Sequence, residues 1–91
     1  MRLIGEIDTA SVLRYWPERE QLFAEAEVHL EAVTLVDSAG LAFLVHWAKA
    51  VSASGRRLRL LAVPAQLQRL ITIYGVSSLF DCDATNPTGH E

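Results

Sequence analysis

The chain has 91 residues, of which 51% are hydrophobic, and a formal net charge of −3. This composition fits one globular domain with a single core and excludes a chain that is mainly disordered. No charge-free stretch is longer than residues 38–48, which is shorter than the roughly 20 residues that a bilayer-spanning helix needs, and the first residues show no signal-peptide pattern. The single cysteine, Cys82, cannot form a disulfide within the chain, so we expect a reducing compartment, by default the cytoplasm.

Charge is unevenly distributed along the chain. The first 45 residues carry a net charge of −5 and the remaining residues a net charge of +2. The basic residues of the second part centre on Arg56, Arg57 and Arg59, which do not make the sustained basic face that a phosphate backbone requires. We therefore expect no nucleic-acid partner.

The first part of the chain predicts a strand, one or two helices and a second strand. A short apolar segment over residues 2–7 contains Gly5, which suggests a strand that runs into a turn. Asp8 and Thr9 can both accept backbone N–H groups and predict a helix start. Pro17 then either ends or kinks that helix or begins a second one over residues 17–26. Alternation over residues 28–30 and an apolar run over residues 33–36 predict the next strand.

The second part continues the alternation of strands and helices. Residues 41–54 have helical periodicity, and Gly55 is a typical stop. A strand over residues 57–63, a helix over 64–75 and a short apolar segment over 76–82 follow. The pattern predicts an α/β sheet with packed helices in a single domain, residues 1–82, and a polar, disordered tail over residues 83–91. The face of the 41–54 helix predicted to be buried holds Leu41, Leu44, Val45, Ala48 and Val51.

The junction between the second strand and the following helix is the most informative stretch. It contains Asp37, Ser38, Ala39 and Gly40. A serine at or near a helix N-terminus is either a cap alone or a contact or phosphorylation point. The helix would tolerate a phosphate on Ser38, because the added negative charge would lie near the positive end of the helix dipole. A partner pressed against that point would be disturbed.

Phe43 and Trp47 lie on the side of the same helix that is opposite its predicted core face. Two large aromatic residues exposed together would mark a protein interface. The alternative is that another segment of the chain covers them, and periodicity leaves both interpretations open.

The sequence shows no catalytic or ligand-binding signature. Ser38 lacks the Gly-x-Ser-x-Gly pattern of a hydrolase nucleophile, and His29, His46 and His90 lack the spacing of a zinc site. No glycine-rich phosphate loop is present. We therefore expect no enzymatic activity, no cofactor and no metal, and a hydrolase that uses Ser38 is the least supported alternative.

Residues 28–41, which end in Asp37-Ser38-Ala39-Gly40-Leu41, resemble the hallmark segment of STAS domains (sulfate transporter and anti-sigma factor antagonist). Residues 3–8 resemble the Leu-x-Gly-Glu-Leu-Asp segment of that family, and residues 55–74 resemble its next strand and helix. The resemblance covers nearly all of the chain up to residue 80. It implies the STAS (SpoIIAA-like) fold, a mixed β-sheet with helices packed on one side, in which this chain starts at the family's second strand.

Residues 39–42, 46–47 and 70–76 are most similar to the MlaB branch of the family. That similarity implies a non-catalytic cytoplasmic subunit that binds the ATPase of an Mla-type ABC transporter. Such transporters move phospholipid and maintain outer-membrane lipid asymmetry, so the subunit would be peripheral to the inner membrane without inserting into it. The implied partner contacts are Asp37, Ser38, Ala39 and Gly40, with Phe43 and Trp47 as further candidates.

Anti-sigma factor antagonists form the alternative branch of the family. In that branch the residue at the position of Ser38 is phosphorylated by an anti-sigma factor kinase. Ala39 stands where members of that branch usually carry a second Ser or Thr, which favours the transporter branch.

Overall fold

The computed structural model describes residues 1–82, so the tail predicted over residues 83–91 lies outside the described residues. Its four strands are β1 (Arg2–Ile7), β2 (Glu27–Val36), β3 (Leu58–Leu61) and β4 (Phe80–Cys82). They form one sheet in the order β1-β2-β3-β4, and all three pairings are parallel. The α/β class is confirmed, but the described strands are parallel throughout instead of mixed. Each strand is connected to the next through helical segments, as a parallel pairing requires.

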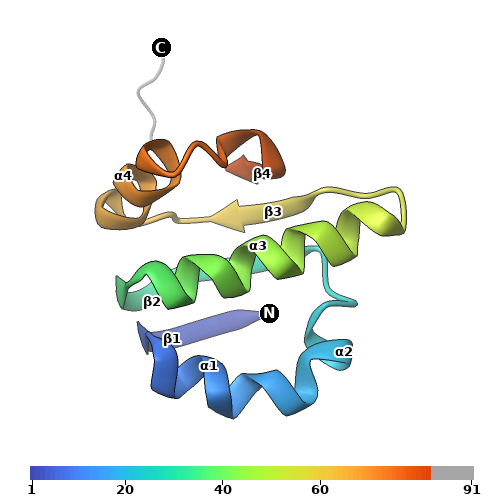
Figure 1. Cartoon of the computed structure of the whole chain (residues 1–91), viewed down its shortest axis with the longest axis horizontal. Helices are drawn as coiled ribbons and strands as arrows, with labels where there is room; N and C mark the ends of the chain where they lie inside the picture. The colour runs from blue at the N-terminus through green and yellow to red at the C-terminus, as the bar shows by residue number, and fades with distance from the viewer. Residues whose placement is uncertain (83–91) are drawn as a thin grey trace.

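The helices lie on one face of the sheet. Helices α1 (Thr9–Tyr15) and α2 (Arg19–Leu22), with the 3₁₀ turn η1 (Trp16–Glu18) between them, connect β1 to β2. Helix α3 (Ser38–Ala53) connects β2 to β3, and α4 (Ala65–Ile73) with η2 (Ser77–Leu79) connects β3 to β4. Right-handed crossovers between strands adjacent in chain order place every helix on the same side. Figure 1 shows α3 in front of β2, with α1 and α2 on one flank and α4 on the other.

The predicted helix start at Asp8 is confirmed by a reciprocal cap. The Asp8 carboxylate accepts a hydrogen bond from the Ser11 backbone N–H (3.0 Å), and the Asp8 N–H donates to the Ser11 hydroxyl (2.8 Å). The bond from the Ser11 backbone holds the pKa of the Asp8 carboxyl below its usual value. Pro17 lies in η1, so α1 ends before it, and the second helix begins at Arg19 and is shorter than residues 17–26.

The core lies between the helices and the inner face of the sheet. Leu3, Leu30 and Leu60 come from three neighbouring strands and are fully buried on the face that the helices cover. The opposite face of the sheet is exposed and carries ion pairs between neighbouring strands, Arg2 with Glu31 (3.7 Å) and Arg59 with Glu27 (2.6 Å). Of the predicted core face of α3, Leu41, Leu44, Ala48 and Val51 are buried, whereas Val45 is only half-buried.

Candidate functional site

At the junction of β2 and α3, the two polar residues Asp37 and Ser38 have different roles. Asp37 is the N-cap of α3, because its carboxylate accepts from the Gly40 N–H at 2.9 Å. The Asp37 N–H donates to the carbonyl oxygen of Ile7 at 3.2 Å, which ties the junction to the end of β1. Ser38 is the first residue of α3 and is exposed. Its hydroxyl makes no hydrogen bond within residues 1–82, so Ser38 is not the cap.

Gly40 is buried where the first turn of α3 meets the end of β1. A Cβ at this position would stand 2.1 Å from the carbonyl oxygen of Ile7 and 2.9 Å from Cγ1 of Val36. The first turn of α3 therefore approaches β1 closely only because residue 40 has no side chain. This packing explains a glycine at position 40 without a partner, while Asp37 and Ala39 are half-buried beside Ser38.

Phe43 and Trp47, which are expected to contact a partner if they are exposed together, are buried in the folded chain. Their exposed fractions are 1% and 0%, because α1, η1 and α2 pack against that flank of α3. Phe43 stacks on Tyr15 with ring centroids 5.9 Å apart, and Trp47 packs on Phe23 at 5.6 Å. The indole Nε1 of Trp47 donates to the carbonyl oxygen of Glu25 at 2.9 Å. A partner could reach these rings only after the helices separated.

An exposed ridge along α3 begins at Ser38. Ala42, His46 and Lys49 continue it at intervals of three to four residues, which is the spacing of one helix face. We call these four residues the Ser38 ridge. It carries no acidic side chain, in a chain whose net charge is −3.

A groove of about 240 Å³ runs along one side of the Ser38 ridge. Tyr74 and Val76, which follow α4, form its far wall, and Leu41 and Val45 form the base of its near wall. Tyr74 is 55% exposed. The groove is therefore apolar at its base and open to a partner side chain. A larger hollow of about 390 Å³ lies along the outer side of α4, but Ser38 does not line it.

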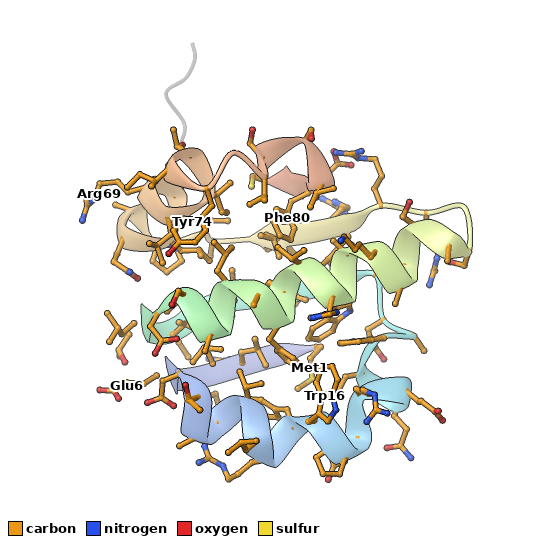
Figure 2. The ribbon with its side chains drawn as sticks, viewed as in Figure 1. Met1, Glu6, Trp16, Arg69, Tyr74 and Phe80 are labelled. Atoms are coloured by element: carbon orange, nitrogen blue, oxygen red, sulfur yellow. The ribbon has the colours of Figure 1, made fainter. Side chains whose placement is uncertain are left out.

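Trp16 forms the other side of the Ser38 ridge, a role that sequence periodicity missed. Its ring meets the His46 ring edge to face at 5.6 Å, and the Arg19 guanidinium lies over it at 4.7 Å. Figure 2 shows Trp16 and Tyr74 on opposite flanks of α3. Trp16 stands in η1 and is 36% exposed. The following Pro17, which interrupts the first predicted helix, was the available signal.

The sequence also matches a known protein family. A family model described as "Mlab, STAS domain" matches residues 1–81. The chain belongs to this STAS domain family. No curated protein matches the chain significantly.

This STAS domain has no assembled catalytic set in its described part. His46 is eight residues along α3 from Ser38, about 12 Å along the helix axis at 1.5 Å per residue, which is too far for a general base. Partial burial and the neighbouring Asp81 raise the pKa of the Cys82 thiol, the opposite of an activated nucleophile. Residues 1–82 contain no group of three potential metal-ligating side chains, and none of their helices is long and apolar enough to span a bilayer.

Proposed function

We propose that the chain is a non-catalytic STAS adaptor that binds the ATPase subunit of an Mla-type ABC phospholipid transporter through the Ser38 ridge. In this role it would lie in the cytoplasm, peripheral to the inner membrane, and support a transporter that maintains outer-membrane lipid asymmetry. Membership of the "Mlab, STAS domain" family supports a role of this general kind.

The observation that carries the proposal is the setting of Ser38. It is an exposed hydroxyl at the start of a ridge that has an exposed aromatic ring, Trp16 or Tyr74, on each flank. Aromatic anchors around a small contact commonly dominate protein interfaces, and residues 1–82 bring no acid–base pair to the Ser38 hydroxyl. Binding explains this arrangement better than catalysis does.

Affinity purification from the native host tests the proposal. The tagged full chain is expected to recover an ABC ATPase, and Ser38→Arg is expected to lose it while the fold survives. Ser52→Arg is the matched control, because Ser52 is an exposed serine of α3 that lies about 21 Å farther along the same helix. Equal recovery with both variants would remove Ser38 from the interface, and recovery of a kinase without an ATPase would refute the transporter role.

The anti-sigma factor antagonist remains the second candidate, supported by one observation. The Ser38 hydroxyl is exposed and unbonded within residues 1–82, so a kinase could reach it, and a phosphate would lie at the favourable end of α3. Intact mass measurement of the native protein tests this role. A stoichiometric phosphate that is lost in Ser38→Ala would support it, and an unmodified mass under all growth conditions would count against it.

A further inference from the structure

The edge of β2 that faces β3 is only partly paired. β3 pairs with residues 27–29 of β2 and ends at Leu61. The chain then leaves the sheet through Ala62, whose φ of 58° is left-handed. β2 continues to Val36, directly before Asp37 and Ser38. On this edge the last residue of β2 therefore lies well beyond the end of the neighbouring strand.

Gln66 of α4 pairs with the end of β2 in place of a strand. Its Oε1 accepts from the Val36 N–H at 3.0 Å, and its Nε2 donates to the Val36 carbonyl oxygen at 2.6 Å. An adjacent strand would bond the same N–H and C=O groups of Val36. On the other edge, the Asp37 N–H donates to Ile7. The backbone that leads into Ser38 is thus held from both sides.

We infer that Gln66 is a positioning residue for the Ser38 ridge. Its carboxamide sets the path of the chain from Val36 into α3, and it also ties the end of β2 to α4, the helix that leads into the groove wall at Tyr74. The spacing between Ser38 and Tyr74 then depends on one side chain that touches neither of them. This inference rests on the proposed function, because the spacing affects binding only if a partner contacts both Ser38 and Tyr74.

The chemistry of the bonds provides a specific test, because residue 66 must donate and accept at once. Gln66→Met keeps the length and removes both bonds. A carboxylate from Gln66→Glu can accept from the Val36 N–H but repels the Val36 carbonyl oxygen, whereas the protonated carboxyl restores both bonds. Along the sequence, the charged residues next to the two bonded positions are Asp37, which follows Val36, and Arg69, which lies one turn after Gln66 in α4. Both residues are also present in the wild type, so the pH dependence of exchange and binding in the wild type measures their contribution.

The experiment compares full-length wild type, Gln66→Met and Gln66→Glu with a matched destabilised control, Phe80→Leu, in the core beneath β4. Hydrogen exchange at Val36 and the affinity for the recovered ATPase are measured at pH 7.5 and pH 5. With Gln66→Met we expect exchange at Val36 to be roughly tenfold faster and binding to be weaker by a similar factor at both pH values. At pH 7.5, Gln66→Glu should show the same exchange rate and affinity as Gln66→Met. At pH 5, both quantities should return toward their wild-type values.

Phe80→Leu should reduce global stability. The affinity of its folded fraction for the ATPase should stay within about twofold of the wild-type affinity, since Phe80 is far from the junction of β2 and α3. The inference is overturned if Gln66→Met binds as well as Phe80→Leu, or if the Glu and Met variants share one pH profile. If the wild type binds no ATPase, the proposed function fails by itself. Unchanged exchange at Val36 in Gln66→Met would then refute the positioning role independently.

Discussion

The carbonyl oxygen of Ile7 lies where a side chain on Gly40 would have to go, 2.1 Å from the Cβ that an alanine would place there. Gly40→Ala should therefore force α3 away from β1 and destabilise the protein by roughly 3 kcal/mol or more, the upper end of overpacking effects. Urea unfolding measures this change.

The control for this substitution is Gly55→Ala. Gly55 has a left-handed φ of 86° but nothing within 4 Å of the added Cβ, so only backbone strain of about 1–2 kcal/mol is expected. Similar losses for the two variants would show that the contact with Ile7 is not the reason for glycine at position 40.

Ala62 is a non-glycine residue with a left-handed φ of 58°. Ala62→Gly should relieve about 1–2 kcal/mol of strain and lose part of that gain to the greater freedom of glycine in the unfolded chain. We expect net stabilisation of roughly 0.5–1 kcal/mol and a higher thermal midpoint. Ala50→Gly, in the exposed part of α3, should change stability in the opposite direction by about 1 kcal/mol. A lower midpoint for Ala62→Gly would contradict the prediction.

Trp47 and Trp16 should differ in solvent access. Trp47 is fully buried and bonded to Glu25, whereas Trp16 is 36% exposed. Acrylamide should quench the fluorescence of Trp47→Phe, which retains Trp16, more strongly than that of Trp16→Phe, which retains Trp47. Trp47→Phe should also cost roughly 1–3 kcal/mol of stability, because it removes the indole hydrogen bond to the Glu25 carbonyl oxygen and shrinks a fully buried side chain. Equal quenching in the two variants would contradict the burial of Trp47.

Trp16 should contribute to partner binding more than to the fold. Trp16→Ala is expected to weaken binding by about tenfold or more, the range of an aromatic anchor. Leu13→Ala is the control, since Leu13 is a 68% exposed apolar residue of α1 that does not flank the Ser38 ridge. Titration against the recovered partner measures both, and equal affinities would place the interface elsewhere.

The Asp8 cap should make stability depend on acid pH. Since the folded pKa of Asp8 is lowered, its contribution is full above the unfolded pKa of about 3.9 and is lost as the pH falls through the folded pKa. Asp8→Asn keeps a capping side chain but cannot titrate. Its stability relative to wild type should therefore rise as the pH falls from 5 to 2.5 in thermal unfolding. A constant difference over that range would rule out this linkage.

Local sequence patterns predicted the helices and strands. The site could be predicted only in part, because it also depends on contacts between segments that are distant in the sequence. The caps at Asp8 and Asp37 depend on a few neighbouring residues. Gln66 could not be found in this way, because it bonds to a residue 30 positions away. The periodicity of α3 placed Phe43 and Trp47 opposite the core without showing that α1 and α2 cover that side as well.

The sequence by itself determined the alternation of strands and helices, the family resemblance and the position of Ser38 at a helix start, since these depend on residue spacing, local hydrogen bonds and short motifs. Tertiary structure alone decided which residues flank Ser38. Packing of three segments against α3 buried Phe43 and Trp47 and left Trp16 and Tyr74 exposed on either side of it. Burial depends on which segments meet in space, and periodicity reports only which side of one helix a residue occupies.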